Sequence, residues 1–372
     1  MEKTLIYPLD ANFLPCLKYR TQFVDNDIIG VCVPKGWARE GTDVGQIANQ
    51  RDIGIVVSNN FNQMLSHCDT VLFCETQGVD NINVLIEDKI YKSIQNGKNV
   101  ICTARLDDKL IKEYAAKAYE KDLKFQSFDG WEKTDINVYE ISDEEPLAQI
   151  NVPVIFVFGM GEGTYKFEIQ LGLREAISQM GYRISQIGSR NYSSLFGFHA
   201  IPDFMFDSHV NECKKIIAFN RFVKKIEVQE SPELIIIGIP GGVAPFNFEY
   251  TNHFGVLAFL ISQAVKSDIS IFSNYYQDYE LRYYEQLKDM LLYRFDAKPD
   301  CFNISNLKID WSKVLEGNYL DFTIVNLDQV DNHINDKKMI YPLYNILNKE
   351  DMYCMANYII DKLNNYGKAL SI

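Results

Sequence analysis

Short apolar runs alternate with longer stretches of mixed polar and apolar residues along the chain. This alternation predicts strands separated by helices, and therefore an α/β protein built on parallel sheets. In the first part, helical spacing of apolar residues predicts one helix that ends at Asn96-Gly97 and another over about 108–121. The predicted strands of this part are Thr4–Tyr7, Ile28–Val33, Ile53–Val57, Val71–Phe73 and Asn99–Thr103. Together these elements predict a Rossmann-like or flavodoxin-like unit.

The same alternation restarts at Val154–Phe158, a continuous apolar run typical of a buried parallel strand. Between the two parts, Ser142–Pro153 is acidic, contains prolines and shows no periodicity, which predicts an interdomain linker. The predicted domains are therefore residues 1–145 and 153–372. The second is expected to contain strands at Arg183–Ile187, Leu234–Ile239, Ile269–Ser273 and Cys301–Ile304. A helix that starts at Lys166 and is stopped by Gly181 is expected, with further helices over 209–225, 253–265, 278–294 and 349–364.

Charge and composition narrow the choice of partners. The chain has 37 Lys and Arg against 50 Asp and Glu, for a net charge of −13, which disfavours non-specific binding of nucleic acid. No apolar run approaches the roughly 20 residues that span a bilayer, and the first residues carry no signal-peptide pattern. We therefore expect a cytoplasmic protein with neither nucleic acid nor a membrane among its partners.

The cysteines give no sign of a metal site. The 8 cysteines never fall as C-x-x-C, and most have apolar neighbours. Scattered cysteines of this kind usually pack as small core side chains. We expect neither a disulfide framework nor a zinc site.

Polar, glycine-rich segments follow several strands of the second domain. In an open parallel sheet, ligands bind at the carboxyl ends of the strands, so these segments predict a site for a polar ligand. Ser273-Asn274-Tyr275 follows one such strand, and the other segments contain the candidate binding residues. These are Gly159, Gly161, Gly163, Thr164, Lys166, Gly188, Ser189, Arg190, Gly241 and Gly242.

The segment Gly159–Lys166 has the order of a phosphate-binding loop: a strand, a glycine-rich turn, a lysine and a helix. It does not match the pattern G-x-x-x-x-G-K-[ST], because Tyr165 replaces the last glycine and Phe167 replaces the hydroxyl that binds magnesium. The alternative is a turn whose glycines only let helix and strand pack closely. We favour an anion or nucleotide site, with ATP or GTP and Mg²⁺ as candidate cofactors, and expect Lys166 to face solvent.

Four residues are candidates for catalysis. Lys166 would neutralise phosphate charge, and Arg190 would clamp a phosphate or carboxylate unless it forms a surface ion pair. His199 would move a proton, although a histidine between aromatic residues is more often a buried structural residue. Asp203 would bind a metal, although after Pro202 its simplest role is a helix N-cap.

The spacing of Gly159 and Lys166 resembles the phosphate loop of dethiobiotin-synthetase-like proteins. The resemblance implies a P-loop NTPase-like second domain in which these two residues keep their places, while Tyr165 and Phe167 depart from the pattern. The strand Leu234–Ile239 also lacks a terminal Asp, the usual second magnesium anchor. These departures count against hydrolysis more than against phosphate binding.

A second resemblance covers most of the chain. It is to a clostridial family of peptide maturation system proteins, associated with ribosomally made natural products, and it implies a precursor peptide and maturation enzymes as partners. It leaves the chemistry and the oligomeric state open, a homodimer included. The segments that carry it are Val33-Pro34-Lys35-Gly36-Trp37, Phe158-Gly159-Met160-Gly161-Glu162, Lys166-Phe167-Glu168-Ile169-Gln170, Ile187-Gly188-Ser189-Arg190-Asn191-Tyr192, Phe204-Met205-Phe206 and Gly238-Ile239-Pro240-Gly241-Gly242.

Three functions follow from these observations. The first is an accessory or modifying protein, an ATP- or GTP-dependent enzyme included, that acts in peptide maturation and binds a nucleotide or other anion at the altered phosphate loop. The second is a catalytically inactive scaffold, derived from an NTPase, that binds the precursor peptide or a partner enzyme. The third is a protein that binds a dinucleotide with its first domain. It is the weakest of the three because no G-x-G-x-x-G follows the first strand, where the chain reads Tyr7-Pro8-Leu9-Asp10.

Overall fold

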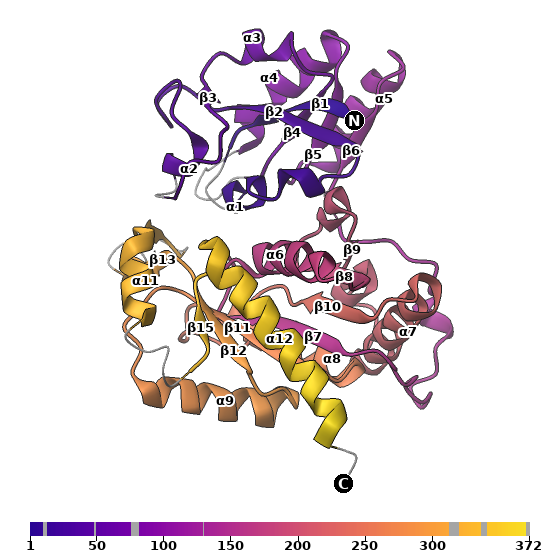
Figure 1. Cartoon of the computed structure of the whole chain (residues 1–372). Helices are drawn as coiled ribbons and strands as arrows, with labels where there is room; N and C mark the ends of the chain where they lie inside the picture. Colours follow the sequence, from indigo (N-terminus) through magenta and orange to yellow (C-terminus); the bar gives the residue numbers. More distant parts are fainter. Residues whose placement is uncertain are drawn as a thin grey trace. The chain divides into compact units, whose positions relative to one another are not determined.

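The computed structural model describes residues 1–9, 13–47, 50–75, 82–128, 130–311, 320–335 and 341–369. The chain divides into two compact units (Figure 1). The first comprises Met1–Trp131 and Ser194–Gly197, and the second comprises Glu132–Ser193 and Phe198–Ile372. Each unit is built around its own parallel sheet, which confirms the predicted α/β class with two parallel-sheet domains.

The first unit contains a parallel sheet of six strands in the order β3-β2-β1-β4-β5-β6. This is the strand order of the Rossmann fold, so the structure selects it over the flavodoxin-like alternative. The strands are β1 (Glu2–Tyr7), β2 (Asn26–Cys32), β3 (Val57–Ser58), β4 (Thr70–Phe73), β5 (Asn99–Cys102) and β6 (Phe125–Ser127).

Strand β3 covers Val57–Ser58, so only Val57 of the predicted strand Ile53–Val57 belongs to it and the prediction was wrong for the residues before Val57. The Asp43 carboxylate accepts hydrogen bonds from the N–H groups of Ile53 and Gly54, each at 2.8 Å. These bonds hold the segment before β3 in a turn, so its backbone donors are not available to a sheet ladder.

Alternation along the strands divides the core of the first unit. Leu5 and Phe73 face one side of the sheet, where they belong to the same buried cluster as Ile86 and Ile90 of α4. The helical elements of this unit are α1 (Leu14–Leu17), η1 (Arg20–Gln22), α2 (Val44–Ile47), α3 (Phe61–Leu65), α4 (Ile82–Gln95) and α5 (Asp108–Tyr119). The helix predicted before Asn96-Gly97 is therefore confirmed as α4.

The second unit contains a parallel sheet of seven strands in the order β15-β12-β11-β7-β10-β8-β9. The central strand β7 pairs with β11 on one side and with β10 on the other. A separate antiparallel pair is formed by β13 (Leu307–Ile309) and β14 (Phe322–Ile324). The strands of the large sheet are β7 (Val154–Gly159), β8 (Ile184–Gly188), β9 (His199–Ala200), β10 (Leu234–Gly238), β11 (Ile269–Asn274), β12 (Cys301–Ile304) and β15 (Leu343–Tyr344).

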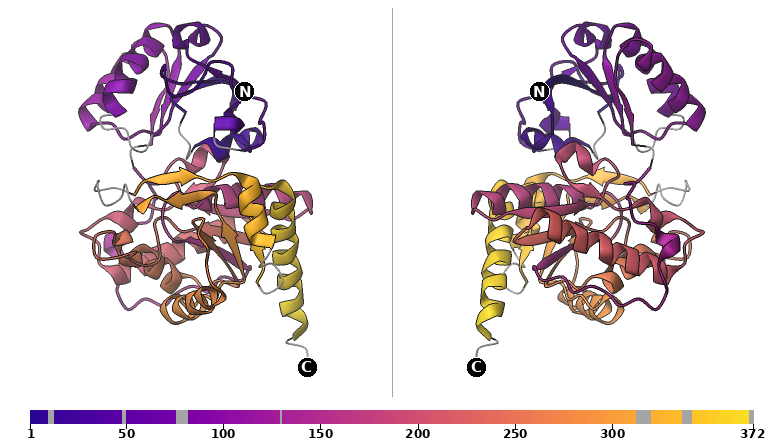
Figure 2. Two further views of the ribbon diagram at one scale, coloured as in Figure 1. Left: turned by 90° about the vertical axis from the view of Figure 1, so that its left-hand side faces the viewer. Right: turned by 90° about the vertical axis from the view of Figure 1, so that its right-hand side faces the viewer.

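Helices cover both faces of this second sheet. Ile155 and Val157 of β7 share a core with residues of α6 and α12, which lie side by side (Figures 1 and 2). On the opposite face, the Phe158 ring lies 5.8 Å from the ring of Phe295 in α9. The helical elements of this unit are η2 (Val138–Glu140), α6 (Lys166–Gln179), η4 (Asp203–Phe206), α7 (Glu212–Glu230), η5 (Asn252–Gly255), α8 (Val256–Ala264), α9 (Leu281–Phe295), α11 (Leu327–Asn335) and α12 (Lys349–Ala369). All but the first residue of η3 (Ser193–Phe196) belong to the first unit.

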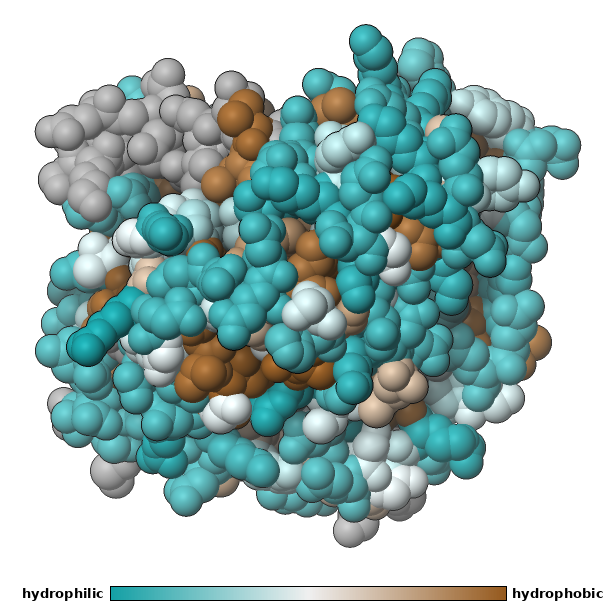
Figure 3. All heavy atoms as spheres, turned by 90° about the horizontal axis from the view of Figure 1, so that it is seen from above, coloured by the Kyte–Doolittle hydropathy of each residue, from teal (hydrophilic) through white to brown (hydrophobic). Residues whose placement is uncertain are grey.

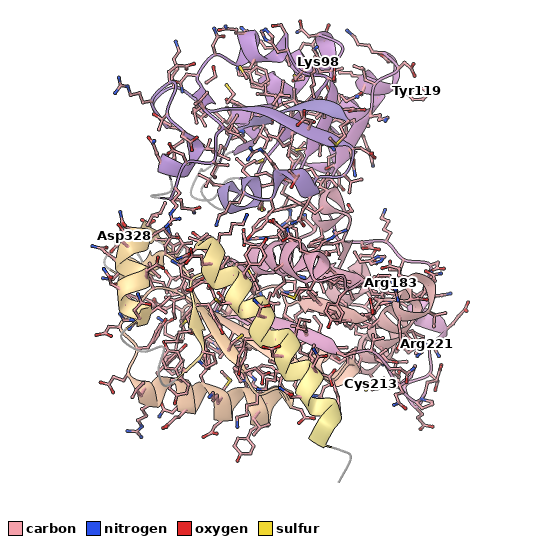
Figure 4. All side chains as sticks on the ribbon, viewed as in Figure 1. Lys98, Tyr119, Arg183, Cys213, Arg221 and Asp328 are labelled. Carbon is pink, nitrogen blue, oxygen red and sulfur yellow. The ribbon has the colours of Figure 1, made fainter. Side chains whose placement is uncertain are left out.

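The predicted linker Ser142–Pro153 lies in the second unit, and the two units divide in the sequence at Trp131. The N–H of Ala148 donates to Asn220 Oδ1 at 2.7 Å, and the N–H of Asn151 donates to Glu227 Oε1 at 2.6 Å. Arg221, labelled in Figure 4, forms an ion pair with Glu145. The segment is therefore attached to α7 by backbone and side-chain contacts.

The described surface is mainly polar on the face drawn in Figure 3, where hydrophobic side chains form smaller areas between hydrophilic ones. Across the described ranges, no helix is both long enough and apolar enough to cross a membrane. Most of the cysteines are buried free thiols, and Cys213 and Cys354 are exposed. Burial raises the pKa of the Cys32 thiol to about 12, as expected for a core side chain.

Candidate functional site

The polar loops of the second unit meet at the carboxyl edge of its sheet. Strands β7, β8, β10 and β11 are parallel, so the loops that follow them emerge at one edge. The chain passes from β7 through α6 to β8 on one side, whereas β11 lies on the other side of β7. The carboxyl end of β7 is therefore a point where strand order reverses, which is where open α/β sheets bind ligands.

Lys166 is the first residue of α6, and its side chain is buried, with 4% of its surface exposed. Its Nζ donates to the carbonyl oxygens of Gly161 and Gly241, each at 2.7 Å. Burial lowers the pKa of Lys166, and the negative charge of Glu162 opposes this shift. The expectation that Lys166 faces solvent was wrong, because the loops after β7 and β10 both contact its ammonium group.

Glu162 places a carboxylate close to Lys166 and Arg190. Its Oε1 accepts the N–H of Gly241 at 2.6 Å, and its Oε2 lies 3.3 Å from Nη1 of Arg190. Partial removal from solvent would by itself raise the pKa of Glu162, but the charges of Lys166 and Arg190 and the Gly241 N–H keep it below its ordinary value. The carboxylate is therefore ionised at neutral pH. We did not single out Glu162 from the sequence, although an acidic residue between two glycines of an anion-binding loop is a signal.

The side chain of Tyr165 does not enter the space enclosed by the loop Gly159–Lys166. Its φ of 63° is the left-handed conformation that the expected glycine adopts freely and that costs another residue about 1 kcal/mol. The ring is buried, and its hydroxyl donates to Asn306 Oδ1 at 2.6 Å. Tyr165 thus satisfies the backbone requirement of the position and directs its side chain into the core.

Phe167 is also buried in the core, but at a position where the phosphate-loop pattern has a hydroxyl. Its ring packs against Tyr192 and Phe198, with centroids 5.7 and 5.6 Å away. No hydroxyl is therefore present where the phosphate-loop pattern places a magnesium ligand, and β10 ends at Gly238 without an Asp. Within the ranges that the structure describes, no group of three His, Cys, Asp or Glu residues is arranged to hold a metal ion.

The glycine-rich loops also serve close packing. A Cβ on Gly242 would lie 2.4 Å from the Met160 carbonyl oxygen, so only glycine fits where the loop after β10 crosses the loop after β7. The Thr164 hydroxyl donates to the Gly161 carbonyl oxygen at 3.0 Å and is used within the loop. Of the predicted residues, Gly161 and Gly241 accept hydrogen bonds from Lys166, and a Cβ on Gly159 would lie 3.0 Å from its Cδ.

The loop after β8 supplies Arg190 to this site. Gly188 ends the strand, and the N–H of Ser189 donates to Gln170 Oε1 of α6 at 3.1 Å. Because Ser189 is tied to α6, the following residue, Arg190, reaches Glu162 across the carboxyl edge. Gly188 and Ser189 therefore position the arginine.

His199 and Asp203 show no contact with this cluster. His199 Nδ1 lies 3.2 Å from Glu132 Oε1, and Nε2 lies 2.6 Å from Glu230 Oε1. Asp203 is exposed and begins η4, and Pro202 occupies the N-cap position. The predicted N-cap role of Asp203 was therefore wrong, because the chain enters this helix one residue earlier.

Two cavities lie away from the cluster. One of about 470 Å³ lies beside β2 and β3 of the first unit, and one of about 260 Å³ is lined in part by Asp203 and Asp207. In a Rossmann fold, a dinucleotide binds where the strand order reverses, between β1 and β4. The larger cavity does not lie there, so it lends no support to the dinucleotide alternative.

Comparison with known proteins defines the fold further. No protein-family model matches this chain, and no curated protein sequence matches it. A solved structure of a DUF1611 family protein from Anabaena variabilis superposes with a TM-score of 0.62 at 9% identity, over 97% of this chain and 100% of that one. The hydrogenase maturation factor HypB from Archaeoglobus fulgidus gives a TM-score of 0.31 at 12% identity, over 56% and 89%, which is too low to support an inference. The chain therefore shares the α/β fold of the DUF1611 family protein over nearly its whole length.

Proposed function

We propose that the second unit binds the phosphate groups of ATP, GTP or another phosphate-bearing anion between the loops that follow β7, β8 and β10. The observation that carries this proposal is the position of the Glu162 carboxylate, which Gly241 N–H and Arg190 hold close to Lys166. Carboxylate and phosphate oxygens accept the same charge-assisted hydrogen bonds. Donors that hold a carboxylate here are thus suited to a phosphate group.

Each cation has a distinct role in this proposal. The Lys166 ammonium is a buried point charge, and burial in a low-dielectric site strengthens its attraction for an anion. The Arg190 guanidinium presents several N–H donors in a plane, which suits phosphate oxygens. No acid–base role is assigned to His199, which contacts Glu132 and Glu230, or to Asp203, which lies at the start of η4.

The packing of Phe167 favours binding without hydrolysis. A magnesium ion that activates phosphoryl transfer needs oxygen ligands from the protein, and the ring of Phe167 lies where the pattern supplies one. Between an enzyme and an inactive scaffold derived from an NTPase, this observation supports the scaffold.

The proposed biological role is the maturation of a ribosomally synthesised peptide in the cytoplasm, with the precursor peptide and maturation enzymes as partners. Its support is the resemblance of the motifs around Val33–Trp37, Phe158–Glu162 and Gly238–Gly242 to the clostridial peptide maturation system proteins. A phosphate-binding scaffold fits that role, because the binding of a nucleotide would control when the scaffold binds its partner.

Isothermal titration of ATP and GTP into the wild-type chain and into Lys166→Ala, with and without Mg²⁺, tests the phosphate site. Removing the buried ammonium removes a charge-assisted contact, so affinity should fall about ten- to a hundredfold. The matched control is Lys266→Ala, because Lys266 is exposed and precedes β11 at the opposite edge of the sheet.

Far-UV circular dichroism of both variants verifies that they are folded. Binding by the wild type that is equally strong in Lys166→Ala, or no binding by the wild type at millimolar nucleotide, would show that Gly159–Lys166 is only a packing turn. Measured turnover of ATP or GTP by the wild type would favour the enzyme over the scaffold.

A further inference from the structure

The Glu162 carboxylate takes the donors that the proposed phosphate would use. One of its oxygens accepts the Gly241 N–H at 2.6 Å, and the other lies 3.3 Å from the Arg190 guanidinium. Lys166 also directs its ammonium at two carbonyl oxygens, those of Gly161 and Gly241. In this state an internal anion already fills the position of an external one.

We propose that Glu162 is an internal competitor that a ligand must displace, and that it restricts the site to polyphosphates such as pyrophosphate or a nucleoside di- or triphosphate. This inference rests on the proposed function, since it concerns the ligand class of the same site. Under this proposal Glu162 determines specificity: it does not contact the bound ligand, and it excludes anions that bind too weakly to displace its carboxylate.

Intramolecular competition explains why the ligand needs several negative charges. A side chain tethered beside its donors acts at an effective concentration in the millimolar range or above. A single carboxylate, such as acetate, only replaces one carboxylate by another and gains no contact. A polyphosphate replaces the Glu162 oxygens on Gly241 and Arg190 and adds further anionic oxygens for Lys166, so it offsets the cost of displacement.

The surroundings of Glu162 allow the displacement. Its side chain is 44% exposed, whereas that of Arg190 is 20% exposed, so the carboxylate has access to solvent while the arginine is more enclosed. The residue lies between Gly161 and Gly163, and Gly163 has a φ of 76°, a conformation that glycine adopts without strain. The hydroxyl of Tyr275 donates to the Glu162 carbonyl oxygen, which holds the backbone while the side chain moves.

Titration of pyrophosphate, monophosphate and acetate into wild type, E162Q and E162A, in magnesium-free buffer, tests the inference. Glutamine keeps the size of the side chain and removes its charge, and alanine removes the competing oxygens. Both variants should bind pyrophosphate about tenfold more tightly than wild type and should gain measurable affinity for monophosphate. The control E249Q makes the same charge change at an exposed residue of the loop after β10 and should bind like wild type.

The outcomes separate this inference from the proposed function. If wild type binds pyrophosphate and both E162Q and E162A bind it equally or more weakly, Glu162 is not a competitor and the phosphate site stands. If E249Q gains as much affinity as E162Q, the effect is one of net charge and the inference is overturned. If neither wild type nor the variants bind any phosphate, the proposed function fails and this inference fails with it.

Discussion

At the scale of single residues, the geometry of the loop after β7 decides what each side chain does. Tyr165 and Phe167 both depart from the phosphate-loop pattern, and both pack their rings in the core, Tyr165 beside Asn306 and Phe167 beside Phe198. Lys166 is buried by two loops, and Glu162 lies among the cations. Tyr165 has to adopt the left-handed backbone of its position, whereas Phe167 lacks the hydroxyl that the pattern supplies, so the first departure concerns the backbone and the second the side chain.

His199 illustrates a residue whose charge state serves stability. Carboxylates face both of its ring nitrogens, so both nitrogens donate only when the ring is protonated. Hydrogen bonding to Glu132, together with that to Glu230 and against the effect of burial, raises the pKa of His199. The bridge between the two glutamates is therefore strongest when His199 is an imidazolium.

The stability that His199 contributes should depend on pH. Because its folded-state pKa is raised above the unfolded value of about 6.5, the contribution is complete below that pH and is lost as pH rises through the folded-state pKa. Urea denaturation of wild type and His199→Gln should thus show a larger difference at pH 6 than at pH 9. A difference that is constant or grows with pH would mean that the ring is neutral in the folded protein.

At the scale of elements, a strand can be recognised in the sequence when it is long and buried on both faces, as β7 is. Strands of only two residues cannot be recognised in this way. Every residue of β7 is buried, so the whole strand reads as an apolar run. Strands β9 and β15 have two residues each and no periodicity of their own, and partner strands alone define them. The segment before β7 has the composition of a linker but is held along α7 by Asn220 and Glu227.

Asn220 should be important for this attachment. Its side chain is 2% exposed, accepts the Ala148 N–H, and donates to the carbonyl oxygens of Ala148 and Ala264. Asn220→Ala leaves these buried backbone groups without their partner and should destabilise the second unit by about 1–3 kcal/mol.

The measurement is urea denaturation followed by fluorescence of Trp311, in a chain whose other tryptophans, Trp37 and Trp131, are replaced by Phe. Arg221→Ala serves as the neighbouring control, because its ion pair with Glu145 is partly exposed and should be worth less than about 1 kcal/mol. Equal losses in the two variants would contradict the assigned role of Asn220.

At the scale of the whole molecule, each unit has its own sheet, but the chain passes between the two units more than once. Residues Ser194–Gly197 belong to the first unit, although the chain on both sides of them belongs to the second. Phe196 is fully buried, its ring lies 4.2 Å from that of Phe23, and the Val24 N–H donates to the Leu195 carbonyl oxygen. The first unit therefore takes part of its core from a loop that follows β8.

Phe196→Ala should weaken the first unit selectively. Removal of a fully buried phenyl ring typically costs about 3–5 kcal/mol. Hydrogen exchange in the full-length variant should accelerate at the amides of β2, near Phe23, and remain unchanged in β7 and β10. Phe248→Ala removes an exposed phenyl ring and should alter neither. Faster exchange in β7 but not in β2 would place Phe196 in the wrong core.

Local pattern by itself determined the α/β class, the positions of most long strands and helices, and the loops that could bind an anion. These features depend on burial and on contacts between neighbours in the chain, so a period of two or 3.6 residues reports them. The linear order also placed Gly159 and Lys166 correctly at a strand end and a helix start.

Tertiary structure alone decided the contacts that define the site. Glu162 meets the N–H of Gly241 across 79 residues, Lys166 meets the Gly241 carbonyl across 75, and Tyr165 meets Asn306 across 141. The Rossmann strand order of the first unit, and the inclusion of Ser194–Gly197 in that unit, also depend on contacts between residues far apart in the sequence. Such pairs form because folding brings distant strand ends to one edge of a sheet, and no periodicity along the chain records which ends become neighbours.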